Sequence, residues 1–131
     1  ELGVHVRLVN MEQKTLLTLR RTLDYQILRS DWVADYLDPA AFLEVFTSRS
    51  GNNHTGWASA AYDALLYEAE RTPDPAARHA KLRQAEAILL QEAPIIPVFH
   101  YTTVRLVHGS VRGWHDTPLD RHPYKHVWLE P

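Results

Sequence analysis

Residues 72–94 read TPDPAARHAKLRQAEAILLQEAP, and this stretch decides the fold of the middle of the chain because it specifies both ends of a helix. Asp74 is a typical N-cap, and Pro75 suits the first helical position because no backbone N–H is needed there. Pro94 cannot continue a helix. The apolar residues between them fall on one helical face, at Leu82, Ala85, Ile88 and Leu89. The pattern therefore predicts a helix that begins at Pro75, ends before Pro94 and buries one face.

Capping signals predict three more helices before this stretch. Ser59 precedes a segment with an apolar face and is expected to cap a helix there. Asn10, with Gln13 three residues later, resembles a capping box and predicts a helix that runs to about Arg21. Asp38-Pro39 again combines a cap with a first-position proline and predicts another helix start.

Alternating apolar residues predict strands between and beyond these helices. The alternation is clearest near the start of the chain, where Val4, Val6 and Leu8 share one face. Pro97 would place its strand at an edge of the sheet or at a crossing point. The predicted strands cover residues 4–9, 24–29, 95–101, 103–107 and 127–129. The alternation of strands and helices predicts an α/β fold.

The composition is that of a globular domain. The chain has 131 residues, of which 45% are apolar and 23% charged, and its net charge is −2 with both signs interspersed. This balance argues against a nucleic-acid partner. The absence of cysteine excludes disulfides and thiolate metal sites but does not fix the compartment. The longest apolar run is too short to span a bilayer. The chain opens at Glu1 without an initiator Met or a signal peptide, so we interpret it as a piece of a longer protein.

Residues 29–39, RSDWVADYLDP, are the best candidate for contact with a ligand. They concentrate a cation, three carboxylates and two large aromatic side chains after a predicted strand and before a predicted helix. Aromatic faces hold a guest by contact area, and fixed charges orient it. This segment therefore suits a binding site better than a core.

Four stretches of the chain resemble one known family. They are residues 29–43, beginning RSDWVADY; residues 52–66, beginning NNHTGW; residues 85–101, ending APIIPVFHY; and residues 105–120, which include RLV and PLD. In this order and spacing they resemble the C-terminal part of the extracytoplasmic solute-binding proteins of peptide ABC importers, the oligopeptide- and dipeptide-binding group.

The resemblance implies an architecture and a function. It implies a C-terminal fragment of a two-lobed, periplasmic-binding-protein-like α/β fold, with a mixed sheet and packed helices. Residues 1–95 would be part of the ligand-binding lobe, and residues 96–131 would be a hinge strand and a return segment toward the other lobe. The whole protein would bind a short peptide by lobe closure outside the cytoplasm and dock on membrane permease subunits. It would need no cofactor and perform no reaction.

The resemblance also implies roles for individual residues. Asp35 would pair with the peptide α-ammonium, and Arg29, with Arg20 less directly, would meet the peptide carboxylate. Trp32 and Val33 would offer main-chain groups to the peptide. Asn52 and Tyr101 would be further pocket-lining positions, and Asp31 is a departure from the family pattern. Asp31 stands where many members have glycine and adds a carboxylate.

Structural interpretations compete with these roles. Asp35 could form an internal salt bridge with Arg29, and Trp32 or Tyr101 could simply pack. The Asn52-Asn53 pair could satisfy backbone groups of its own loop. His122 and His126 are four residues apart, but Pro123 makes a regular helix between them doubtful, so no metal site is predicted.

Three alternatives for function remain open. The chain could bind another solute on the same fold, such as haem, a metal chelate or an opine-like compound. It could be a hydrolase that uses the histidines and aspartates of its C-terminal part. Without the rest of its protein it could lack a ligand site, and we expect exposed apolar surface to favour dimerisation of the fragment.

Overall fold

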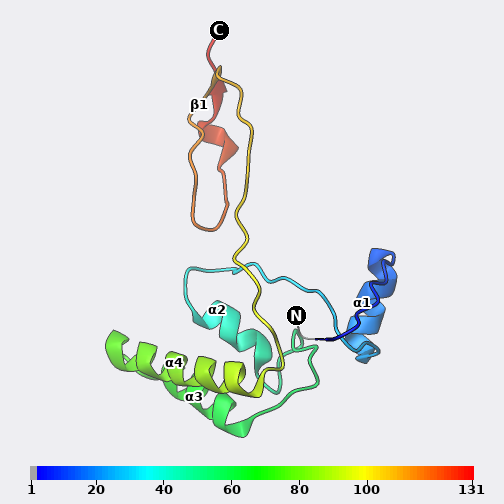
Figure 1. Cartoon of the computed structure of the whole chain (residues 1–131). Helices are drawn as coiled ribbons and strands as arrows, with labels where there is room; N and C mark the ends of the chain where they lie inside the picture. Colours follow the sequence, from blue (N-terminus) through cyan, green and yellow to red (C-terminus); the bar gives the residue numbers. More distant parts are fainter. Residues whose placement is uncertain (1–2) are drawn as a thin grey trace.

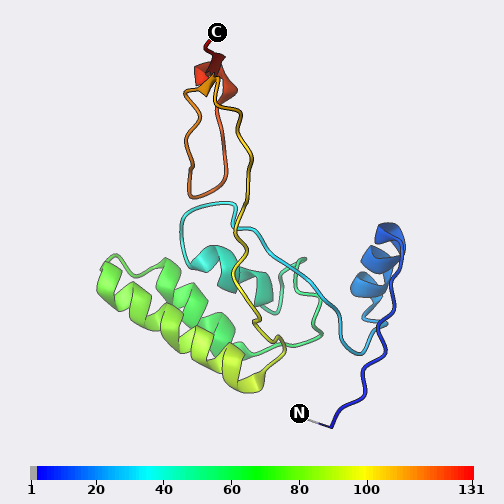
Figure 2. The ribbon, with the colours of Figure 1, turned by 45° about the horizontal axis from the view of Figure 1, so that its top comes forward.

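The computed structural model describes residues 3–131 and is mainly helical. The elements are α1 (Gln13–Thr22), α2 (Ala40–Leu43), η1 (Glu44–Phe46), α3 (Ala60–Glu70), α4 (Pro75–Glu92), β1 (Val111–Arg112), η2 (Tyr124–His126) and β2 (Trp128–Leu129). Helices α2, α3 and α4 lie together, while α1 stands apart from them (Figure 1). After α4 the chain leaves this group as a long extension, which ends in the β1–β2 pair (Figures 1 and 2).

The two longest helices begin where the capping residues predict. The side chain of Ser59 accepts a hydrogen bond from the backbone N–H of Tyr62 at 3.4 Å, and that of Asp74 accepts one from Ala77 at 2.7 Å. Pro75 is the first residue of α4, and the helix ends at Ala93 in the left-handed conformation, with φ of 50°. The predicted boundaries of this helix are therefore confirmed.

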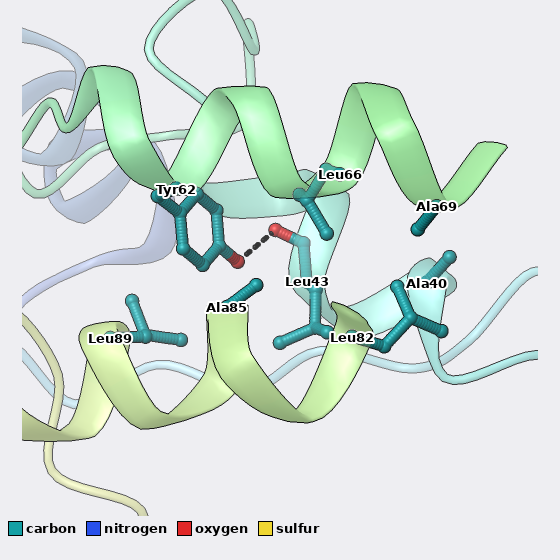
Figure 3. Packing of buried hydrophobic residues seen from close by; sticks show 8 residues of the cluster. All are labelled: Ala40, Leu43, Tyr62, Leu66, Ala69, Leu82, Ala85 and Leu89. Atoms are coloured by element: carbon teal, nitrogen blue, oxygen red, sulfur yellow. Dashed lines mark hydrogen bonds between the residues drawn. The ribbon is translucent and has the colours of Figure 1, made fainter. Parts of the chain in front are cut away.

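The core is formed where α3 and α4 pack against each other and against α2 (Figure 3). The predicted stripe of α4 is confirmed, because Leu82, Ala85 and Leu89 are buried and Ile88 is partly buried against the same cluster. The largest core side chain is Tyr62, which is fully buried and donates its hydroxyl to the Leu43 carbonyl at 2.6 Å. Burial raises the pKa of this phenol well above its ordinary value.

An ion pair joins the start of α2 to α4. Both carboxylate oxygens of Asp38 accept hydrogen bonds from the Arg78 guanidinium at 2.8 Å, and one of them also accepts the backbone N–H of Ala40 at 2.8 Å. The hydrogen bonds from Arg78 hold the pKa of Asp38 below its ordinary value. Helix α2 begins at Ala40, one residue later than the Asp38-Pro39 pair predicts, because Pro39 rather than Asp38 occupies the cap position. Asp38 instead joins the short helix to α4.

The predicted strands are mostly wrong for the described chain. Within residues 3–131 the only sheet is the antiparallel pair of β1 and β2, in which Val111 lies opposite Leu129 and Arg112 opposite Trp128. The predicted strand at residues 127–129 therefore corresponds to β2. The segments 4–9, 24–29, 95–101 and 103–107 pair with nothing within residues 3–131, so the expected mixed sheet is not seen there. A strand needs a hydrogen-bonding neighbour, and side-chain alternation alone does not supply one.

Two local details complete the fold. Helix α1 begins two residues later than predicted, because Glu12 rather than Asn10 caps it by accepting the Thr15 N–H at 3.2 Å. Beside β1, Gly113 has φ of 75°, and a Cβ atom there would overlap the His126 carbonyl. Among residues 3–131, no helix combines the length and the apolar character that crossing a bilayer requires.

Candidate ligand-binding site

Two segments distant in sequence meet beside the helical group. We call residues 29–36, which lie between α1 and α2, the ligand segment, and residues 95–131, which follow α4, the arm. The two run past each other above α2 (Figure 1). Two hydrogen bonds join them, one from Arg29 to Tyr101 and one from Arg121 to Asp35. The candidate site is this crossing.

The structure brings together two of the predicted site residues. Nη2 of Arg29 donates a hydrogen bond to the phenol oxygen of Tyr101 at 2.9 Å, although the residues are 72 positions apart. The Tyr101 ring packs at a tilt against Phe99, with 5.1 Å between the ring centroids, and stays exposed. Arg29 is exposed as well, so further guanidinium N–H groups remain accessible to a carboxylate.

The two aromatic side chains of the ligand segment hold it against α2 and η1. The indole N–H of Trp32 donates to the Ala41 carbonyl at 2.9 Å, and the Tyr36 hydroxyl donates to the Glu44 carboxylate at 2.7 Å. Burial, followed by the hydrogen bond to Glu44, raises the pKa of Tyr36 to about 12. Trp32 therefore has a structural role besides any contact of its exposed surface, and the sequence analysis missed the Tyr36–Glu44 contact.

The acidic side chains of the ligand segment are free of internal partners. Within residues 3–131 the carboxylates of Asp31 and Asp35 form no hydrogen bond or ion pair, and both residues are exposed. The alternative Arg29–Asp35 salt bridge is thus not seen in the described chain. The main chain of Asp35 is engaged, because its carbonyl oxygen accepts a hydrogen bond from Nη2 of Arg121 at 3.2 Å.

The backbone of the ligand segment is also open. Within the described residues, the backbone N–H and C=O groups of Trp32 and Val33 make no hydrogen bond, and the Val33 side chain is exposed. Free main-chain groups can pair with those of an extended peptide. The segment therefore presents a carboxylate, a guanidinium and unpaired main-chain groups on one short length of chain.

The remaining predicted residues lie at a second place, around the loop before α3. Arg20 is in the last turn of α1, and its Nε atom is buried without a hydrogen bond in the described chain. Burial, with the nearby charges of Arg20 and Arg21, lowers the pKa of His54. The Tyr25 hydroxyl donates to the His54 carbonyl and ties this loop to the segment after α1. The sequence analysis missed that Arg20, Arg21 and His54 lie close together. In the sequence, only the adjacent pair Arg20-Arg21 indicated a basic cluster.

Of the two asparagines in this loop, the structure assigns the loop-organising role to Asn53. Its Nδ2 donates to three backbone carbonyls at 3.0–3.2 Å, those of Phe46, Thr47 and Trp57. Asn52 is exposed and uses only its backbone N–H, which donates to the Ser50 hydroxyl at 3.2 Å. The loop-satisfying alternative is therefore confirmed for Asn53, and the side chain of Asn52 stays available.

Two hollows within residues 3–131 lie away from the crossing, one between α2, α3 and α4 and one beside Trp114. Within the same residues, no group of three or more histidine, aspartate or glutamate side chains is placed to hold a metal ion. The residues predicted to contact a ligand at the crossing are exposed rather than enclosed.

The chain is similar to solute-binding proteins over nearly all of its length. It is 40% identical over 129 residues to the dipeptide-binding protein DppE of Bacillus subtilis, which covers 98% of this chain and 23% of the relative. It is 40% identical over 113 residues to the probable deoxycholate-binding periplasmic protein YgiS of Escherichia coli, covering 86% of this chain and 21% of that protein. No protein-family model matches the chain.

The fold is shared with solved structures from the same group. The Escherichia coli murein tripeptide binding protein MppA superposes with a TM-score of 0.90 at 35% identity, covering 98% of this chain and 25% of that structure. The unliganded open form of MppA gives a TM-score of 0.81 over the same share of both chains. This chain spans about a quarter or less of the length of these proteins.

Proposed function

Because nearly the whole chain is homologous to oligopeptide- and dipeptide-binding proteins, we propose that it is part of the peptide-binding component of an ABC importer. The protein binds a short peptide outside the cytoplasm and delivers it to membrane permease subunits. The observation that carries the proposal is the ligand segment, where the Asp35 carboxylate is exposed and free of internal partners beside unpaired backbone groups. The relatives are solute-binding proteins, which favours binding over hydrolysis.

The chemistry of the crossing suits the two ends of a peptide. The peptide ammonium pairs with Asp35, a charge-assisted hydrogen bond worth roughly 1.5–3 kcal/mol net. The planar guanidinium of Arg29, held by Tyr101, is oriented to meet a carboxylate. The backbone of Trp32 and Val33 pairs with the peptide amides, so affinity does not depend on the peptide's side chains.

We also propose that the chain crosses between two bodies of the full protein. Residues 1–95 belong to the ligand-binding lobe, and the arm carries the chain back toward the other lobe. The arm leaves the helical group in an extended form, which supports this division (Figure 2). The TM-score is lower for the open form of MppA than for the other MppA structure, although the same protein is compared in both cases. The difference supports a division of the matched segment between two bodies that are placed differently in the two structures.

The decisive test removes one charge without changing the shape of the side chain. In the full-length protein that contains this segment, Asp35→Asn is expected to weaken binding of a free dipeptide or tripeptide at least about tenfold, the equivalent of ~1.4 kcal/mol. Isothermal titration calorimetry measures both affinities. Wild type should discriminate against the N-acetylated form of the same peptide, and Asp35→Asn should lose most of that discrimination.

A neighbouring acid supplies the matched control. Asp31 is on the same segment and equally free of partners within residues 3–131, so Asp31→Asn should keep the preference for the free ammonium. If Asp35→Asn binds the free peptide as tightly as wild type does, the assignment of Asp35 to the ammonium is wrong.

One observation favours a second candidate. YgiS, which has the same 40% identity to this chain as DppE but over 113 rather than 129 residues, is named as a probable deoxycholate-binding protein. The same scaffold could therefore hold a solute without an ammonium group. For such a ligand, Asp35→Asn should leave the affinity unchanged, and the apolar surface of Trp32 and Val33 should matter more. Titration of wild type with deoxycholate and with a dipeptide separates the two candidates.

A further inference from the structure

Arg121, on the arm, contacts the main chain of the ligand segment. Its guanidinium donates to the Asp35 carbonyl across 86 positions of sequence. Asp35 is the residue to which the proposed function assigns the ligand's ammonium. A cation that holds the main chain of this residue, without occupying its carboxylate, can fix where that carboxylate points.

The backbone of Arg121 is itself held on both sides by one hydroxyl group. The Thr117 hydroxyl accepts the Arg121 N–H at 2.8 Å and donates to the Arg121 carbonyl at 2.9 Å. The N–H of Asp120 bonds the Thr117 carbonyl at 2.9 Å, and Asp120 has φ of 55°, the left-handed conformation. This turn therefore presents the side chain of Arg121 from a constrained point.

The residues on either side of Arg121 form an ionic group. Asp120 pairs with Arg105, and one of its carboxylate oxygens lies 2.8 Å from Nε2 of His122. The hydrogen bonds from Arg105 and His122 lower the pKa of Asp120 to about 2, so this carboxylate is an anion that only accepts hydrogen bonds near neutral pH.

The ring of His122 adds two contacts to this turn. Its Nδ1 lies 2.9 Å from the His115 carbonyl oxygen, and its Nε2 lies 2.8 Å from a carboxylate oxygen of Asp120. The ring is stacked on Trp114 at 4.2 Å between centroids, and its side chain is 7% exposed.

We propose that Arg121 is a positioning residue that fixes the ligand segment through the Asp35 carbonyl, and that the turn presenting it is held in place by the Thr117 hydroxyl and by the contact of His122 with Asp120. This proposal rests on the proposed function only for its effect on ligand affinity. The charged groups that face the ring are Asp120 and, across the same carboxylate, Arg105. The ring of His115, the other titratable group nearby, is turned to the Gly113 carbonyl at 3.3 Å.

The first experiment needs no ligand and tests the positioning role by itself. In the full-length protein, Arg121→Ala should increase amide hydrogen exchange in residues 30–37 by at least about threefold, and Arg121→Lys should restore part of the protection. Arg112→Ala is the control, because Arg112 pairs with Glu130 within the arm. Unchanged exchange in residues 30–37 of Arg121→Ala would overturn the proposal.

The second experiment tests the effect on affinity. Calorimetric titration of the full-length protein with a free dipeptide should show that Arg121→Ala binds several-fold more weakly than wild type, while Arg112→Ala binds as wild type does. Unchanged affinity of Arg121→Ala would refute the effect on the ligand.

The two readouts distinguish the failure of this proposal from the failure of the proposed function. If Arg121→Ala loosens residues 30–37 but the wild type binds no peptide, the positioning role stands and the peptide assignment fails. If the wild type binds peptide through Asp35 but Arg121→Ala changes neither exchange nor affinity, the positioning role fails and the proposed function stands.

Discussion

At the scale of single residues, one side-chain hydrogen bond lies inside the core of the helical group. Its donor is strongly constrained, because the hydroxyl of Tyr62 is the polar end of the largest fully buried side chain. Among the described residues its acceptor is the carbonyl of Leu43, which belongs to another helix. The bond therefore connects α3 with α2 through the core.

Removal of this hydroxyl should have a measurable cost. Tyr62→Phe leaves the Leu43 carbonyl without its buried donor and should lower the free energy of unfolding of the full-length protein by about 1–2 kcal/mol. Urea denaturation followed by circular dichroism measures the loss. Tyr67→Phe, on the exposed side of the same helix, is the matched control and should change stability little. Equal stability of the two variants would contradict this role of Tyr62.

The Asp38–Arg78 pair makes a prediction about acid. The pKa of Asp38 is lowered in the fold, so the ionised carboxylate contributes stability above its ordinary pKa of 3.8, and this contribution is lost as the pH falls through the lowered value. Asp38→Asn should therefore reduce stability at pH 7, by about 1 kcal/mol for a pair that is one-quarter exposed, and by less at pH 3. Urea unfolding of both proteins at the two pH values checks this, and a difference that grows at pH 3 would show the opposite sign.

At the scale of elements, α3 and α4 are stabilised mainly by the apolar faces that they present to each other. Leu89→Ala, in the buried stripe, should reduce the free energy of unfolding by about 2–4 kcal/mol, because the side chain leaves a cavity that the packed helices cannot fill. Leu90→Ala is the control one position further along, where the side chain is half exposed. Thermal denaturation of the two variants should separate clearly. Similar melting temperatures would mean that the stripe does not carry the packing.

The same helices show which features could be predicted from sequence. Ser59, Asp74 and Pro75 act on the residues directly after them, so their roles could be predicted from a few neighbouring letters. The strand at residues 4–9 could not, because pairing depends on a partner that may lie anywhere in a protein, and none is present within residues 3–131. The Arg29–Tyr101 contact follows from no local pattern, and the resemblance to the peptide-binding family was its only signal.

At the scale of the whole molecule, much apolar surface is uncovered along the extended segments. Val4, Leu8, Val98 and Leu106 are each more than two-thirds exposed, with Leu106 fully exposed. The relatives are about four times longer than this chain, so further chain is available to cover such surface in them. The expected self-association of the fragment finds no support in the comparisons, and size-exclusion chromatography would test it.

The isolated chain should bind peptide poorly. Under the proposed function, the crossing encloses only part of the ligand, and enclosure on several sides is what gives small ligands most of their affinity. Calorimetry should therefore show no binding in the micromolar range for the isolated chain, and clear binding of the same peptide by the full-length protein. Micromolar affinity of the 131 residues alone would mean that the crossing is a complete site.

Gly113 has a consequence in genetic terms. Every single-nucleotide missense change in a glycine codon introduces a residue with a Cβ atom, and at this position that atom would overlap the His126 carbonyl while φ stays positive. No missense change there leaves the backbone undisturbed, so a library of random codons should return glycine codons alone among well-folded clones. The shape of the β1–β2 pair is thus inherited through one codon that can change only synonymously.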